Sequence, residues 1–249
     1  MNNDRMDLGL KDRVFVVTGA TRGLGHATAG ALVAEGAKVV VTGREQEGAD
    51  AAAARLGAGA VGVGGDNADP ALAGRLVATA RERFGRFDGL LVSVGGPPPG
   101  FLGELDDERW RASFESVFLG AVRLARTAAA ELGEGGAIGF VLSSSVHEPI
   151  PGLTLSNGLR PALAGVAKSL ASELGPRGIR VFGVLPGRID TDRIRELHGG
   201  ATPDARGIPL GRLGTPEEFG RTTAFLLSPA ASYVTGVMLP VDGGARHGF

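Results

Sequence analysis

Two short segments of the chain carry residues whose types and spacing can do chemistry. The first, VVTGATRGLG, places Gly19, Gly23 and Gly25 between a β-branched run and a stretch of helical spacing. Glycines in that setting let the backbone turn sharply and bring its amides close to a pyrophosphate at a helix N-terminus. The second, SSSVHEP at 143–149, brings hydroxyls and a histidine together. These segments predict a nucleotide-dependent enzyme.

The composition argues against several other function classes. The net charge is −1 and the 26 lysines and arginines are dispersed, so no nucleic-acid or membrane-surface partner is expected. The chain has no cysteine, and its four histidines are scattered, so neither a disulfide nor a metal site is predicted. The first residues lack an apolar signal core and no run of about 18 apolar residues occurs, which predicts a cytoplasmic protein. A small-molecule substrate is therefore the expected partner.

The elements that must position these residues alternate regularly along the chain. Short β-branched runs are followed by longer Ala- and Leu-rich stretches of helical spacing, and strands so apolar on both faces belong inside a helix-covered parallel sheet. We predict an α/β fold: a single doubly wound Rossmann-type domain over 1–249, with 187–215 as a lid over the ligand crevice. The predicted strands lie at 13–19, 38–43, 60–65, 88–94, 137–145, 179–187 and 237–244, and the predicted helices at 24–35, 45–56, 70–84, 107–132, 158–175 and 216–227.

Ordered motifs along essentially the whole chain resemble those of the short-chain dehydrogenase/reductase family, in particular of 3-oxoacyl-acyl-carrier-protein reductases. The glycine spacing is G-x-x-x-G-x-G after Thr18, and the other motifs are GDNAD, LPGRIDT, GRLGTPEEF and YVTGVMLPVDGG. The resemblance implies a nicotinamide cofactor. It assigns the cofactor contacts to Thr18, Gly19, Thr21, Arg22, Gly23, Leu24, Gly25, Arg44, Asp66, Asn67, Ser93, Gly95, Pro186, Gly187, Ile189 and Thr191.

Two arginines favour NADP(H) over NAD(H). An NAD enzyme of this fold keeps an acidic residue at the end of the second strand to hold the ribose 2′-hydroxyl. Here that position is Arg44, whose guanidinium would pair with a 2′-phosphate, and Arg22 in the glycine loop adds a second cation. The alternative for Arg44 is a solvated arginine at a helix start.

Most of the catalytic residues of the family are replaced in this chain. The family uses an asparagine, a serine and a Tyr-x-x-x-Lys in which the tyrosine donates the proton. Counting back from LASELGPRGIRVFGVLPG places Ser156 at the tyrosine position and Arg160 at the lysine position, while Ser143 keeps the serine and Val117 stands at the asparagine. Tyr233 is the only tyrosine and Val237 follows it at four residues, so no Tyr-x-x-x-Lys exists.

The replacements change the chemistry that the site can perform. A serine hydroxyl is too weak an acid to donate a proton near neutral pH, and an arginine stays protonated. Ser143, Ser156 and Arg160 are therefore predicted to stabilise a developing oxyanion rather than to supply a proton. His147 is the candidate donor, through a water molecule, with a solvated loop histidine as the alternative.

These residues favour an NADP(H)-dependent oxidoreductase that acts on a small organic carbonyl or a conjugated enone. The first alternative is a non-catalytic NADP(H)-binding sensor or scaffold, and another is an isomerase or dehydratase that uses the nucleotide structurally. The family resemblance also implies a homotetramer, formed through the fourth and fifth helices and the last strand, with a homodimer as the second possibility.

Overall fold

Seven parallel strands form one sheet in the computed structural model, which describes residues 7–197, 199–201 and 203–248. Every neighbouring pair of strands runs parallel. The order across the sheet is β3-β2-β1-β4-β5-β6-β7, which confirms the predicted doubly wound α/β fold. The strands are β1 (Val14–Val17), β2 (Lys38–Gly43), β3 (Ala60–Gly64), β4 (Gly89–Val92), β5 (Ala137–Val141), β6 (Arg180–Pro186) and β7 (Met238–Val241).

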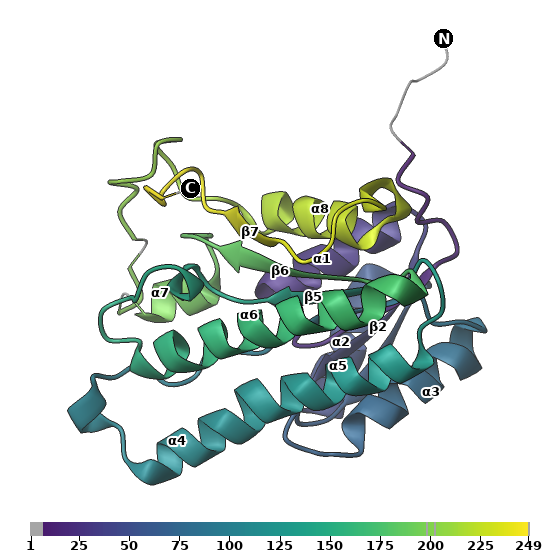
Figure 1. Ribbon diagram of the computed structural model, residues 1–249, viewed down its shortest axis with the longest axis horizontal. Helices are drawn as coiled ribbons and strands as arrows, with labels where there is room; N and C mark the ends of the chain where they lie inside the picture. Colours follow the sequence, from purple (N-terminus) through teal and green to yellow (C-terminus); the bar gives the residue numbers. More distant parts are fainter. Residues whose placement is uncertain (1–6, 198, 202, 249) are drawn as a thin grey trace.

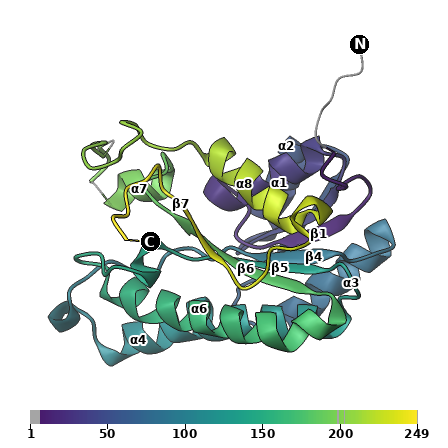
Figure 2. The ribbon, with the colours of Figure 1, turned by 45° about the horizontal axis from the view of Figure 1, so that its top comes forward.

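Helices cover both faces of the sheet (Figures 1 and 2). One layer contains α1 (Gly23–Ala34), α2 (Gln46–Leu56) and α8 (Pro216–Leu227). The other contains α3 (Leu72–Phe84), α4 (Asp107–Ser113), α5 (Gly120–Glu131) and α6 (Thr154–Leu174). The short helix α7 (Asp192–Leu197) lies apart from both layers, beyond the end of β6 (Figure 1).

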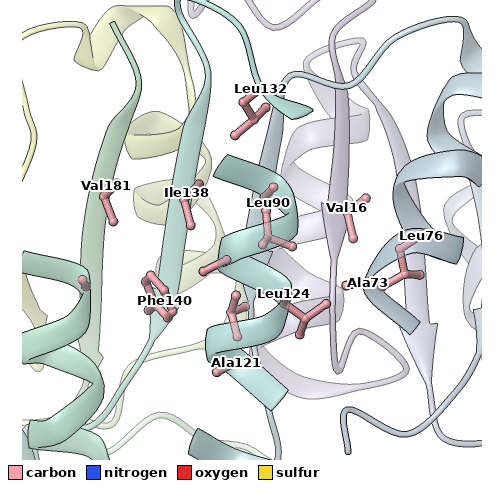
Figure 3. Packing of buried hydrophobic residues seen from close by; sticks show 14 of the residues in the cluster. Val16, Ala73, Leu76, Leu90, Ala121, Leu124, Leu132, Ile138, Phe140 and Val181 are labelled. Atoms are coloured by element: carbon pink, nitrogen blue, oxygen red, sulfur yellow. The ribbon is translucent and has the colours of Figure 1, made fainter. Parts of the chain in front are cut away.

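The core consists of two apolar clusters, one on each side of the sheet. On one side Phe15 and Val17 pack with residues of α1, α2 and α8. On the other side Val16, Leu90 and Ile138 lie against α3 and α5 (Figure 3). Alternate residues of each strand thus enter opposite clusters, which explains why the strand sequences are apolar throughout.

Three predicted segments differ from the structure in detail. The helix predicted at 107–132 contains a π-helical stretch, Phe114–Leu119, between α4 and α5. The helix predicted at 158–175 begins at Thr154, so Ser156 lies in its first turn. The predicted lid at 187–215 contains α7, and its residues 198 and 202 lie outside the described part of the chain.

The sheet topology places a crevice at the carboxyl edge of the strands. The chain passes from β1 outward to β2 and β3, and then returns to the opposite side of β1 with β4. In open α/β sheets ligands bind outside the carboxyl ends of the strands where the order reverses in this way. Within the described residues, no helix combines the length and apolar character needed to cross a membrane.

Candidate active site

A cleft of about 1380 Å³ lies at this carboxyl edge. The loops that follow β1, β2, β3, β4, β5 and β6 all contribute to its walls. The structure brings together in it every predicted site residue except Thr18: Gly19, Thr21, Arg22, Gly23, Leu24, Gly25, Arg44, Asp66, Asn67, Ser93, Gly95, Ser143, His147, Ser156, Arg160, Pro186, Gly187, Ile189 and Thr191.

The glycine loop between β1 and α1 can be built only with glycine at its key positions. Gly19 has φ +54°, and a Cβ there would lie 2.1 Å from the Ser93 carbonyl oxygen. A Cβ on Gly25 would lie 2.5 Å from the Gly19 oxygen. Gly23 opens α1 with φ +60°, a left-handed conformation that side chains disfavour. The loop therefore presents bare backbone at a helix N-terminus, which suits a phosphate group.

Thr18 lies beneath the cleft and joins two strand ends. Its hydroxyl accepts a hydrogen bond from the Ser93 amide at 2.9 Å and donates one to the Ser93 carbonyl at 3.1 Å. Both residues are buried. These bonds hold the loop after β4 against the glycine loop. A Cβ on Gly95, two residues after Ser93, would have no other atom within 4 Å.

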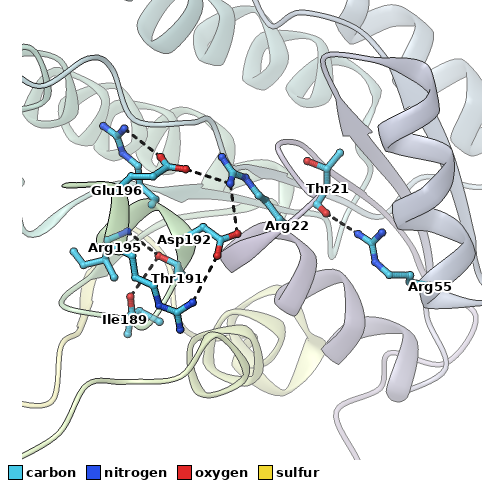
Figure 4. A network of polar contacts seen from close by, with 10 residues as sticks. Thr21, Arg22, Arg55, Ile189, Thr191, Asp192, Arg195 and Glu196 are labelled. Atoms are coloured by element: carbon cyan, nitrogen blue, oxygen red, sulfur yellow. Dashed lines mark hydrogen bonds and ion pairs between the residues drawn. The ribbon is translucent and has the colours of Figure 1, made fainter. Parts of the chain in front are cut away.

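The two cationic residues predicted to select the cofactor have different surroundings. Arg44 is exposed at the cleft and makes no hydrogen bond or ion pair with another described residue. Arg22 is also exposed, but its Nη1 lies 3.4 Å from Asp192 Oδ2 and 3.3 Å from Glu196 Oε1 of α7 (Figure 4). The structure thus leaves Arg44 available to a ligand and engages Arg22 with α7.

The segments after β3 and β6 also form walls of the cleft. Asp66 accepts a hydrogen bond from the Ala68 amide at 2.9 Å, which fixes the turn that carries Asn67. In the segment after β6, a Cβ on Gly187 would lie 2.5 Å from Asp242 Cβ, so only glycine fits there. The Thr191 hydroxyl accepts from the Ile194 amide at 3.4 Å and so begins α7.

The serines after β5 form a connected group with the start of α6. The Ser145 amide donates to Ser143 Oγ at 3.1 Å, and Ser145 Oγ lies 3.4 Å from Ser156 Oγ. Ser156 is 9% exposed and Ser145 is buried. Ser143 and Ser156 both line the cleft. The arrangement therefore offers hydroxyl donors to the cleft.

Arg160 is a buried cation whose hydrogen-bond acceptors are backbone carbonyls. Its Nη1 donates to the Val141 oxygen at 3.0 Å, and its Nη2 to the Val94 oxygen at 3.1 Å. The residue is 4% exposed, and burial, with a smaller contribution from the nearby Arg193 charge, lowers the pKa of Arg160 to about 10. Carbonyl dipoles partly offset the desolvation of this charge, and the described residues supply no carboxylate to it.

His147 lies in the exposed loop after β5. Burial and, to a smaller extent, the Arg246 charge lower the pKa of His147 below its usual value of 6.5. The imidazole is therefore mostly neutral at pH 7. Near pH 7 such an imidazole is seldom in the protonated form that could donate a proton.

Sequence reasoning missed several arginines of this cleft, among them Arg193 and Arg246. Arg193 Nη2 donates to the Pro97 oxygen at 2.8 Å, on the loop whose Val94 oxygen accepts from Arg160. Arg246 reaches the cleft from the segment after β7. Neither lies in one of the motifs that the sequence analysis recognised.

Comparisons with known proteins place this geometry among oxidoreductases. A family model described as enoyl-(acyl carrier protein) reductase matches residues 19–246. The chain is 34% identical over 249 residues to the 3-oxoacyl-[acyl-carrier-protein] reductase of Escherichia coli, covering 95% of this chain and 98% of that protein. Two solved structures are similar over 98% of this chain and all of theirs. A short-chain dehydrogenase/reductase of Brucella melitensis has a TM-score of 0.91 at 33% identity, and the L-sorbose reductase of Gluconobacter frateurii, solved with NADPH and L-sorbose, has 0.89 at 30%.

Proposed function

The chain belongs to the short-chain dehydrogenase/reductase family, and from this membership we propose that it is an NADP(H)-dependent reductase of a small organic carbonyl or conjugated enone. Its active site works without the tyrosine that donates the proton elsewhere in the family. The observation that carries this proposal is the grouping of Ser143, Ser156 and buried Arg160 in the cleft that also contains the glycine loop.

The residues of the cleft fit a dinucleotide phosphate. The glycine loop offers backbone amides and no side-chain bulk, and Gly95 leaves open space on the opposite wall. Arg44 makes no hydrogen bond or ion pair with another described residue and stands at the end of β2, where the 2′-phosphate of NADP(H) would lie. Arg44 therefore supports NADP(H) over NAD(H).

The same residues favour an acceptor whose product is a stabilised anion. NADPH, when bound, supplies a hydride. Ser143 and Ser156 then donate hydrogen bonds to the acceptor oxygen, and the Arg160 charge stabilises the negative charge that develops there. With a conjugated enone the hydride adds to the β-carbon, the π electrons move to the oxygen, and water later protonates the α-carbon of the enolate. No step needs a side-chain acid, which is consistent with Ser156 at the tyrosine position.

A spectrophotometric screen tests the proposal. Purified protein is mixed with NADPH and a panel of ketones, quinones and enones, and absorbance is followed at the nicotinamide band. We expect consumption with conjugated acceptors and slower or no consumption with simple ketones. A Ser143→Ala/Ser156→Ala double variant should bind NADPH as tightly and turn over more slowly. Tight NADPH binding without consumption on any acceptor would contradict the enzymatic proposal.

The contacts of Arg160 support a second candidate, a non-catalytic NADP(H)-binding sensor or scaffold. Two of its nitrogens donate to carbonyls of β5 and of the loop after β4. An arginine committed in this way could serve only to hold the cleft walls together. The same absorbance screen separates the two candidates.

We also propose a homotetramer, with a homodimer as the second possibility. The support is exposed aromatic surface on the segments that the resemblance implicates. Phe114, 45% exposed, stacks on Phe118 between α4 and α5, with ring centroids 5.1 Å apart. Tyr233, just before β7, is fully exposed. Light scattering at micromolar concentration tests this, and a monomer would contradict it.

A further inference from the structure

Six charged side chains form a network of alternating sign between the glycine loop and α7, and Figure 4 shows its centre around Arg22, Asp192 and Glu196. Arg22 contacts Asp192 and Glu196, as described above. Each of these carboxylates also has a second arginine on its own helix. Arg195 Nη1 lies 3.8 Å from Asp192, and Arg193 Nη1 lies 3.9 Å from Glu196. The outer end of the network is Asp190, whose Oδ1 lies 2.8 Å from Arg195.

Arg22 also stands beside the position predicted for the 2′-phosphate. The Ala20 amide donates to the Thr42 oxygen at 2.9 Å, and a Cβ on Gly43 would lie 2.2 Å from Thr21 Cγ2. The backbone of the glycine loop therefore runs against the end of β2 just before Arg22 and Arg44, and both arginines line the cleft. The Arg55 side chain holds this stretch by donating to the Thr21 oxygen at 2.8 Å (Figure 4).

The position of α7 depends on polar contacts. The helix has six residues and none of them is buried. Its side-chain contacts with the rest of the protein include the two ion pairs of Arg22 and the bond from Arg193 to the Pro97 oxygen. Because no residue of α7 is fully buried, these polar contacts contribute to its docking, and removing one of them shifts the equilibrium between its docked and undocked positions.

We propose that Asp192 and Glu196 compete with the cofactor for Arg22, so that a 2′-phosphate takes the arginine from α7 and releases that helix from the cleft. This inference rests on the proposed use of NADP(H). The exchange leaves no orphaned carboxylate, because Asp192 keeps Arg195 and Glu196 keeps Arg193. In this exchange Arg22 gives up two ion pairs at 3.3–3.4 Å with carboxylates that are about half exposed. It gains bonds to a doubly charged phosphate, which are stronger. NAD(H), which lacks the phosphate, leaves α7 docked.

The competition predicts a selective gain of affinity when the two carboxylates are neutralised. In an Asp192→Asn/Glu196→Gln variant, the dissociation constant of NADP⁺ should fall about fivefold, the equivalent of two exposed ion pairs of ordinary strength, while that of NAD⁺ stays within about twofold. Both constants are measured by calorimetric titration at one ionic strength. Asp190→Asn is the matched control, because it removes a carboxylate of the same segment that contacts Arg195 and not Arg22. Its NADP⁺ affinity should change much less.

A second readout follows α7 itself. In the native protein, tryptic cleavage after Arg195 should be faster with saturating NADP⁺ than with saturating NAD⁺, by up to the same fivefold, and the difference should disappear in the double variant. Slower cleavage with NADP⁺, or weaker binding of both cofactors by the double variant, would show that Arg22 keeps α7 closed over the bound cofactor and would overturn the inference. Equal affinity of the native protein for NADP⁺ and NAD⁺ would instead contradict the proposed cofactor preference. A native preference for NADP⁺ with an unchanged ratio in the double variant would contradict the competition alone.

Discussion

Replacing Arg160 by methionine should separate catalysis from stability. Methionine keeps a long, apolar stem but removes the charge and the donors to the Val141 and Val94 oxygens. Burial lowers the pKa of Arg160 to about 10, which corresponds to about 3 kcal/mol by which burial disfavours its charged form. Removing the charge relieves that cost. Leaving two carbonyls without their donors costs about 1–3 kcal/mol each where water does not replace them.

These opposing terms are of similar size, so the free energy of unfolding of Arg160→Met should stay within about 2 kcal/mol of the native value. The rate with a conjugated acceptor should fall about 10²-fold, the typical loss when one oxyanion-stabilising group is removed. Urea denaturation followed by circular dichroism measures the first quantity, and NADPH consumption measures the second. Arg160→Lys, which keeps the charge on a shorter donor, should recover part of the rate.

The sign of the pH dependence gives an independent check. Since the pKa of Arg160 is lowered to about 10 in the folded state, the native protein binds fewer protons than the unfolded chain from about pH 10 up to the pKa of the unfolded arginine, so Arg160 alone makes stability rise with pH in that window. The destabilising contribution of the buried Arg160 charge is fully present below pH 10.

An Arg160→Met variant that reduces every acceptor as fast as the native protein would refute the catalytic role. A loss of stability far above 2 kcal/mol would show that Arg160 mainly holds the walls of the cleft together.

Further predictions concern the cofactor, the proton and the scaffold. Arg44→Asp should weaken NADPH binding by on the order of tenfold to a hundredfold and leave NADH binding nearly unchanged, measured by fluorescence titration; equal losses for both would contradict the assignment. If His147 donates the proton, the rate should fall as pH rises through a value below 6.5, because its pKa is lowered, and this inflection should be absent in His147→Ala; an inflection that persists belongs to another group. Arg180→Ala should lower the free energy of unfolding by about 2–4 kcal/mol, because its guanidinium caps the last carbonyls of α8 at 2.6–3.3 Å; a loss below about 1 kcal/mol in urea denaturation would contradict that role. Ser156→Tyr combined with Arg160→Lys should retain cofactor binding and add reduction of simple ketones with an alkaline inflection in the rate; no ketone reduction by this double variant would argue against the assigned register.

The fold could be predicted because its signals are local. Each strand is a short β-branched run, and each face of the sheet requires apolar residues, so the sequence pattern follows directly from burial on both sides. Gly19 was predictable from its motif, although the atom that excludes a side chain there, the Ser93 carbonyl oxygen, lies on another loop. The π-helical stretch around Val117 was not predictable, since it changes the backbone path without a change in residue pattern.

The contacts of the charged residues could not be predicted in the same way. Arg22 and Asp192 are 170 positions apart in the chain, and their contact is an exposed ion pair that either residue could replace with water. The sequence therefore identified Arg22 as a cation of the cofactor loop but gave no indication that α7 holds it. Only the folded structure shows that α7 lies against the glycine loop and contacts Arg22.

Arg160 and Arg180 show the same limit inside the protein. Both are buried, both donate to backbone carbonyls, and burial lowers the pKa of each to about 10. Carbonyl oxygens belong to every residue type, so no sequence pattern marks an arginine that binds them. The two differ in what lies beside the guanidinium: Arg180 closes the end of α8, whereas Arg160 lines the cleft with Ser156. A charge of the same chemical kind thus closes the end of a helix at one position and lines the wall of the cleft at the other.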